Sequence, residues 1–75
     1  MWVEVYEKNQ AGHTFKLFDR NLPTGGYDEL HRIYEDFCSG KYNGNYIDSN
    51  VLGWSKERDY DTGDVTLYIK TSSWR

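Results

Sequence analysis

The sequence predicts an α+β fold, a four-stranded, mainly antiparallel sheet (β-β-α-β-β) with one helix packed on one of its faces. One segment, residues 27–39, has the apolar period of an amphipathic helix. Two runs before it and two after it alternate apolar and polar residues, as half-buried strands do. Turn-forming residues separate these runs and no repeat or linker divides the chain, so residues 1–75 are expected to form a single small globular domain.

The first two strands are expected to form a hairpin. Residues 2–8 and 13–20 both alternate, and the turn between them contains Gly12, which tolerates a positive φ. The face toward the helix should carry Val3, Val5, Phe15 and Leu17. The opposite, open face should carry Trp2, Tyr6 and Phe18.

Residues 27–39 are expected to form the helix. Apolar residues recur at intervals of three and four positions and so form one stripe: Leu30, Ile33, Tyr34, Phe37 and Cys38. Asp28 and Glu29 lie in the first turn, where the helix dipole favours negative charge, and Gly40 is suited to end the helix. A helix this short is marginal alone in water, so its stripe should pack on the sheet.

The second pair of strands is expected at residues 51–60 and 65–71, joined by a turn at 61–64. In the last strand the alternation places Tyr68 on the open face. The pattern does not determine the strand order, and it leaves open whether Trp54 and Trp74 belong to the core or the surface.

Residues 41–50 are expected to form a loop. The Asn43-Gly44 pair is a strong turn signal, but the runs on either side of it are too short to predict a hairpin. The loop should expose two tyrosines, Tyr42 and Tyr46.

Composition restricts the class of protein. Three Trp, seven Tyr and three Phe are more rings than a domain of 75 residues can bury, so some should lie on a binding surface. The net charge of −3 argues against binding to a nucleic-acid backbone. The N-terminal stretch lacks the features of a signal peptide and no segment could span a membrane, so the expected location is cytoplasmic.

Three segments offer candidate catalytic, metal or phosphate sites, and each has a simpler interpretation. About 10 Å along the helix separates Cys38 from His31, too far for a direct catalytic pair, although Glu35 between them makes a metal site conceivable. Residues 59–64 lack the ligand order of a calcium loop, and residues 23–26 lack the lysine of a phosphate loop. Cys38 is interpreted as a small core residue and His31 as solvated. We therefore expect no catalytic residue, no cofactor and no metal site.

The leading hypothesis is a non-enzymatic protein–protein interaction module that acts through an aromatic-rich open sheet face and the loop at 41–50. Its size and composition suggest a small inhibitor or accessory protein, such as a phage or bacterial antagonist of a larger protein target, and a homodimer is a further option. The alternative is a single-stranded nucleic-acid-binding protein that stacks bases on the same rings. The predicted partner-binding residues are Trp2, Tyr6, Phe18, Tyr42, Tyr46, Tyr68, Asp59, Asp61 and Asp64.

Overall fold

A computed structural model describes residues 2–22, 27–42, 44, 46–47 and 49–74 of the chain. It contains the predicted elements in the predicted order, and the predicted connection at 23–26 lies outside the described residues. The elements are β1 (Trp2–Lys8), β2 (Thr14–Asn21), α1 (Tyr27–Cys38), β3 (Val51–Arg58) and β4 (Val65–Thr71).

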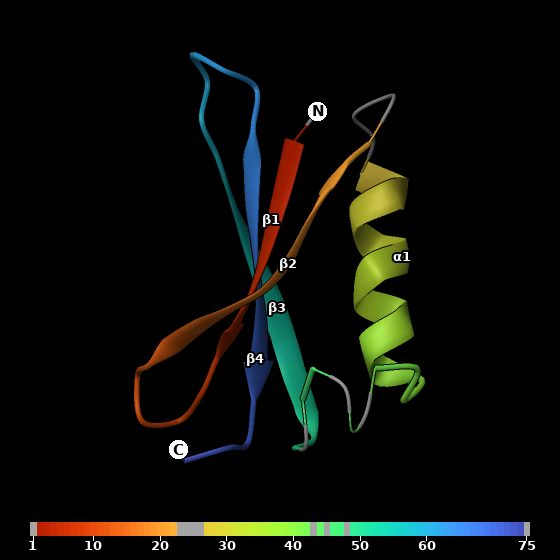
Figure 1. The fold of residues 1–75 in the computed structure, drawn as a ribbon, viewed down its shortest axis with the longest axis vertical. Helices are drawn as coiled ribbons and strands as arrows, with labels where there is room; N and C mark the ends of the chain where they lie inside the picture. The colour runs from red at the N-terminus through yellow and green to blue at the C-terminus, as the bar shows by residue number, and fades with distance from the viewer. Residues whose placement is uncertain (1, 23–26, 43, 45, 48, 75) are drawn as a thin grey trace.

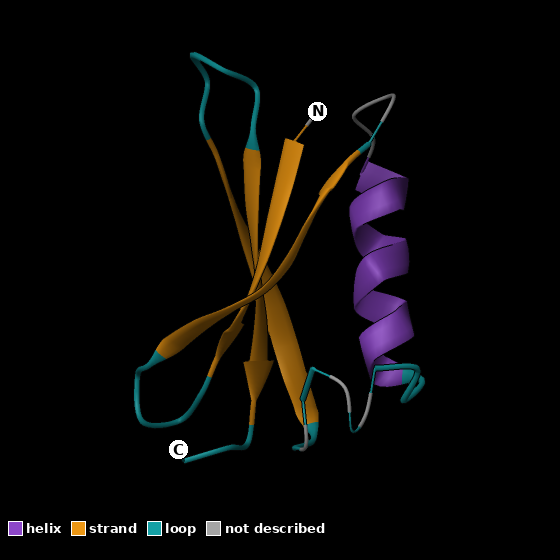
Figure 2. Ribbon diagram, in the orientation of Figure 1, coloured by secondary structure: helices purple, strands orange, loops and turns teal. Residues whose placement is uncertain are grey.

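The four strands form one mixed sheet in the order β2-β1-β4-β3. The two hairpins, β1–β2 and β3–β4, are antiparallel, whereas the central pair β1–β4 is parallel. Helix α1 lies along one face of this strongly twisted sheet (Figures 1 and 2), and no described helix covers the other face. The sheet therefore has a covered face and an open face.

The central strands supply most of the core. Every second residue of β1 and β4 points toward α1, and the resulting set is almost completely buried: Val3, Val5, Glu7, Val65, Leu67, Ile69 and Thr71. Each buried aliphatic side chain contributes about 1.5–3 kcal/mol of burial free energy. Glu7 is the charged member of this set, and the Thr71 hydroxyl donates a hydrogen bond of 2.6 Å to its carboxylate, which links β1 to β4.

Helix α1 packs its apolar stripe on these strands and ends as its sequence predicts. Leu30, Ile33 and Phe37 are buried. Gly40 has a φ of 86°, the Lys41 amide donates to the Asp36 carbonyl, and the Gly40 amide donates to the Phe37 carbonyl, which together form a Schellman motif. Cys38 departs from the prediction, because it is exposed at the end of the stripe and does not belong to the core.

A bulge in the β1–β2 hairpin makes the predicted face of Phe18 wrong. Val5 lies opposite Phe18 and the next pair is Tyr6 with Lys16, so Leu17 is an extra residue in β2. One extra residue transfers the rest of a strand to its other face, and Phe18 consequently points toward the helix. Its ring stacks on Phe37, with centroids 6.1 Å apart. Leu17 is half-buried against the core.

The same bulge leaves Phe15 on the covered side of the sheet, opposite Glu7, but near the end of the hairpin. Its side chain is 40% exposed there, so it contributes less to the core than its predicted position implies.

The segment after the helix is only partly as predicted. Tyr42 was expected to be exposed, yet it is 8% exposed and its ring centroid is 4.5 Å from that of Phe37. Ile47 is also buried, whereas Tyr46 is exposed as predicted. Asn43, Asn45 and Asp48 lie outside the described residues. The loop folds back onto the helix C-terminus because these apolar side chains find a surface there.

The two tryptophans that the sequence left open have different environments. Trp54 lies opposite Ile69 on the covered face and stacks on Tyr34, with centroids 5.5 Å apart. Trp74 follows β4 and is 74% exposed. Trp54 therefore closes the core at the β3 edge, and Trp74 does not.

The bulge predicts an order of mutational effects on stability. Phe18→Ser should lower the free energy of unfolding by about 2 kcal/mol, roughly half the cost for a fully buried phenylalanine. Phe15→Ser should cost about 1 kcal/mol or less, since its ring is already partly in water. Urea denaturation of the two variants measures the difference, and the reverse order would indicate a β2 without the bulge.

The helix stripe predicts a second effect. Ile33 is buried against the sheet while the adjacent Arg32 is exposed. Ile33→Asp should lower the free energy of unfolding by at least about 3 kcal/mol, because it buries an unpaired charge. Arg32→Asp is the matched control, and it should change stability by no more than about 0.5 kcal/mol. Equal effects at the two positions in thermal denaturation would contradict the assigned helix face.

Candidate protein-binding face

The open face consists of the strand side chains that point away from α1. The pairing register places on it one set of residues from each strand: Lys16 and Asp19 of β2, Trp2, Glu4, Tyr6 and Lys8 of β1, Thr66, Tyr68 and Lys70 of β4, and Ser55 and Glu57 of β3. Aromatic rings thus lie on the central strands, and charged groups surround them.

Tyr6 and Tyr68 form the centre of the open face. They are direct neighbours across the parallel β1–β4 pair, and their ring centroids are 5.8 Å apart. Both side chains are half-buried by their neighbours. Trp2, four residues before Tyr6 on the same side of β1, is 42% exposed. The three rings follow the middle of the sheet, where backbone hydrogen bonds on both sides hold the strands.

The Tyr68 hydroxyl lies in a partly desolvated and negative environment. Burial, and then the charges of Glu57, Tyr6 and Glu4, raise the pKa of Tyr68 above the ordinary 10.0. Both effects disfavour the tyrosinate, because a low dielectric and nearby carboxylates penalise a second negative charge. The carboxylates therefore act on the same surface as the central rings.

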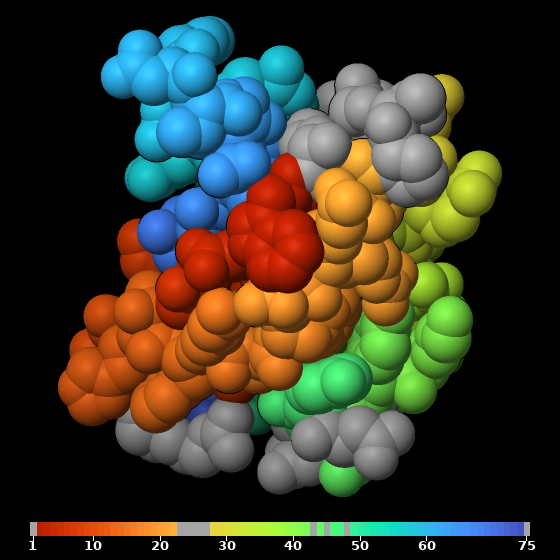
Figure 3. Space-filling view, turned by 45° about the horizontal axis from the view of Figure 1, so that its top comes forward, coloured from red at the N-terminus to blue at the C-terminus, as the bar shows by residue number. Residues whose placement is uncertain are grey.

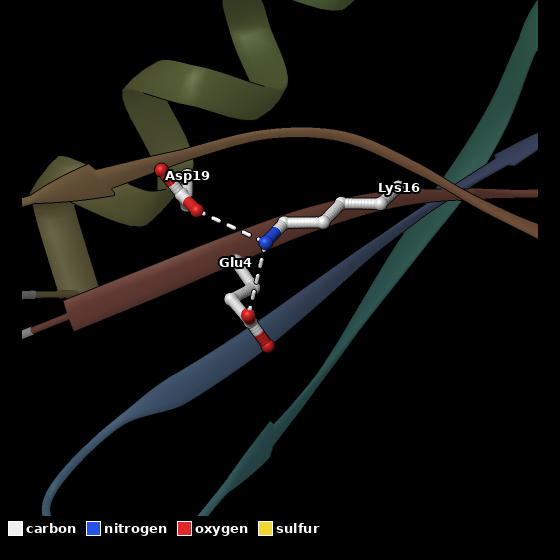
Figure 4. A network of polar contacts seen from close by, with 3 residues as sticks. All are labelled: Glu4, Lys16 and Asp19. Atoms are coloured by element: carbon white, nitrogen blue, oxygen red, sulfur yellow. Dashed lines mark hydrogen bonds and ion pairs between the residues drawn. The ribbon is translucent and has the colours of Figure 1, made fainter.

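Lys16 joins two carboxylates at the β2 edge of the open face (Figure 4). Its ammonium nitrogen is 3.2 Å from Glu4 Oε1 and 3.0 Å from Asp19 Oδ2. Hydrogen bonds to Asp19 and then to Glu4 raise the pKa of Lys16. The three groups are more than a third exposed, so the network orients the two carboxylates more than it stabilises the fold.

An acidic hollow of about 510 Å³ opens at the end of the face where β1 begins and β3 turns into β4. In Figure 3 the start of β1 (red) lies between the end of β2 (orange) and the β3–β4 hairpin (cyan to blue). The hollow is lined mainly by an indole and four carboxylates: Trp2, Glu4, Glu57, Asp59 and Asp64. Arg58 adds one positive charge to the same lining. This end of the open face is therefore predominantly negative.

The β3–β4 turn uses part of the predicted acidic set for its own structure. Asp59 Oδ1 accepts hydrogen bonds from the amides of Asp61 and Thr62, at 2.9 and 3.4 Å. Gly63 completes the turn with a φ of 79°. Asp61 is exposed at the tip, outside the lining of the hollow. Asp64 lines the hollow, and it contributes to the turn through its backbone, since its carbonyl accepts a hydrogen bond of 2.9 Å from the Asp59 amide.

The structure divides the predicted binding residues between two faces. Trp2, Tyr6 and Tyr68 lie on the open face as expected. Phe18, Tyr42 and Tyr46 instead form a ring cluster on the helix side, with the Phe18 centroid 5.1 Å from that of Tyr46 and 5.6 Å from that of Tyr42. The bulge at Leu17 moves Phe18 to this cluster, and burial removes Tyr42 from any surface set.

Sequence reasoning missed Glu57. It lies on β3 opposite Thr66 of β4, and Glu4 lies opposite the same threonine on β1, so β4 separates the two glutamates. The sequence predicts the turn that pairs β3 with β4, but it does not predict that β1 is the other neighbour of β4. The alignment of the two glutamates across the sheet therefore could not be predicted.

The described residues of α1 form no candidate site as well defined as the open face. His31 Nδ1 is 2.9 Å from Glu35 Oε1 within one turn of the helix. A hydrogen bond with Cys38 is the main cause that raises the pKa of Tyr34. No group of three His, Cys, Asp or Glu side chains that could hold a metal is found among the described residues. Within the same residues, no helix has the length and apolarity needed to cross a bilayer.

The pKa of Tyr68 predicts a pH dependence of stability. Because the folded state holds the phenolic proton more tightly than the unfolded state, this contribution is complete below about pH 10 and is lost as the pH rises through the raised pKa. The free energy of unfolding should fall more steeply above about pH 10 in the wild type than in Tyr68→Phe. Glu57→Gln should lower the pKa of Tyr68 in a tyrosinate absorbance titration, and an unchanged midpoint would contradict the assigned environment.

Comparison of the chain with protein-family models, curated proteins and solved structures finds no match. A function must therefore be inferred from the exposure, charge and packing of the open face itself.

Proposed function

We propose that the chain is a non-enzymatic protein-binding module whose open face docks on a protein partner. The observation that carries this proposal is the row of Trp2, Tyr6 and Tyr68 on the central strands, with no described helix over it. A large half-exposed aromatic surface on one side of a small domain is typical of interaction sites.

The position of the rings supports binding with little reorganisation. Tyr6 and Tyr68 belong to the two strands that have a neighbour on each side. Ordering side chains and loops on association costs free energy, and a surface that is already held by the sheet avoids much of that cost. Aromatic residues at the centre of a patch with charged residues around them also match the distribution of binding hot spots.

The charges around the rings indicate the chemistry of the partner. The open face is negative at the end where β1 begins, because Glu4, Glu57 and Asp64 lie there. A partner should therefore present basic groups to this end. Exposed charges of this kind raise the association rate more than the affinity, and salt should screen them. A protein of this size would act by covering a surface of its target, as a small inhibitor or accessory subunit does.

Affinity capture from a host lysate tests the proposal, with the protein immobilised and captured proteins identified by mass spectrometry. The wild type should capture a protein partner that survives nuclease treatment, and Trp2→Ala and Tyr68→Ala should each lose most of it. Tyr46→Ala is the matched control, because it removes an exposed tyrosine from the helix side. Circular dichroism melting confirms that each variant is folded.

The possible outcomes separate the alternatives. Capture lost with Tyr46→Ala but kept with Tyr68→Ala would place binding on the helix side and overturn the proposal. Capture abolished by nuclease would show that the rings stack on nucleic-acid bases instead.

A further inference from the structure

We propose that a second copy of the chain is a partner of the open face, so that two open faces pack together in a two-fold symmetric dimer. This inference rests on the proposed function, because it uses the same rings. It adds the identity of one occupant, and it follows from the distribution of charge along the strands.

Charges of opposite sign lie at opposite ends of the open face. We call a row of residues paired side by side across the four strands a level. One level consists of Asp19, Glu4, Thr66 and Glu57. Two residues further along β1 comes the level of Tyr6 and Tyr68, and two residues beyond that the level of Lys8 and Lys70. At about 3.3 Å per residue, the acidic and basic levels lie roughly 13 Å apart, with the tyrosines midway.

The basic level and Glu57 are unsatisfied within one copy. Lys8 and Lys70 are direct neighbours across the parallel pair, and like charges in such positions repel. Within the described part of the chain neither lysine has an ion-pair partner, and nor does Glu57. Lys16 offsets one of the two negative charges of Glu4 and Asp19, so the acidic level remains negative, and Glu57 adds a further carboxylate to it.

A two-fold axis selects one arrangement of the two copies. An axis that lies in the interface and crosses the strands at the tyrosine level turns one copy end for end. Lys8 then comes to the level of Glu4 of the second copy. Lys70 comes over Thr66, one strand spacing of about 4.8 Å from Glu57, within reach of its long side chain. An axis parallel to the strands would instead place the acidic levels together.

The tyrosines occupy the centre of this arrangement. The two-fold axis passes at the level of Tyr6 and Tyr68, so each tyrosine faces the same tyrosine of the second copy. Every contact away from the axis occurs twice, once in each half of the interface. The twist of each sheet allows two such faces to pack at a small angle, as in a β-sandwich.

The size of the face predicts a weak dimer. Four strands of seven or eight residues form a face of roughly 19 by 23 Å, or about 900 Å² in total for two copies. Stable specific interfaces bury about 1,200–2,000 Å², so a dimer of this area should dissociate readily. A target that needs the same rings can then displace the second copy, and dimer and target complex are mutually exclusive.

Sedimentation equilibrium of the full chain over a range of concentration and salt tests the inference. The wild type should show a monomer–dimer equilibrium that weakens as salt rises. Lys70→Glu and Glu57→Lys should each shift it strongly to monomer. An equimolar mixture of the two variants should restore dimer, because in the mixed dimer one of the two ion pairs keeps its original sense and the other is reversed. Arg32→Glu is the matched control, with the same change of charge on an exposed helix position.

Nuclear magnetic resonance of the unsubstituted chain provides a second readout that does not depend on variant folding. Dilution should shift the signals of Tyr6, Tyr68 and Lys70 and leave those of α1 unchanged. A wild type that stays monomeric at all concentrations, or a dimer indifferent to both charge reversals, would overturn the inference. If the dimer is not found but Trp2→Ala and Tyr68→Ala still abolish capture of another protein, the proposed function is supported and the dimer is not. If the dimer is found but no other protein is captured, the dimer is supported and the proposed function is not.

Discussion

The parallel pairing of β1 with β4 is the constraint on which the rest of the structure depends. It joins two hairpins that are distant in sequence, and it brings Val3 and Val5 beside Val65 and Leu67 under the helix. On the other side of the same strands it makes Tyr6 and Tyr68 neighbours. The core and the candidate binding face are therefore two sides of one contact, and the hydrogen bond from Thr71 to Glu7 reinforces it at its far end.

Features encoded in local periodicity could be predicted from the sequence. The bounds of β1, α1 and β4, the buried faces of the central strands and the glycine that ends the helix all depend on neighbouring residues. The position of Phe18 could not be predicted, because the extra residue at Leu17 interrupts a pattern that alternates without a visible break. Tyr42 was misplaced for a different reason: a loop composed of polar residues folds back because a few apolar side chains within it find a surface.

The sequence predicts the aromatic residues that lie on the candidate binding face, but not how these residues are arranged relative to one another. Alternation alone identifies Trp2, Tyr6 and Tyr68 as residues that face away from the core. The contact between Tyr6 and Tyr68 depends on the strand order, which no local pattern specifies. The alignment of Glu4 with Glu57, and of Lys8 with Lys70, has the same origin. Strand order therefore converts scattered surface charges into two opposed levels, and the proposed basic partner and the proposed second copy both depend on this polarity.

The central position of β1 also has a consequence for synthesis. Among the described strands β1 is made before the others, yet one of its two neighbours is β4, which is made after them. Until β4 is present, one edge of β1 lacks its hydrogen-bonding neighbour. Val3 and Val5 then also lack the side chains of Val65 and Leu67 beside them. Contacts between distant parts of a chain slow folding. The pairing of β1 with β4, and the core that it holds together, can therefore be complete only after Thr71 has been synthesised.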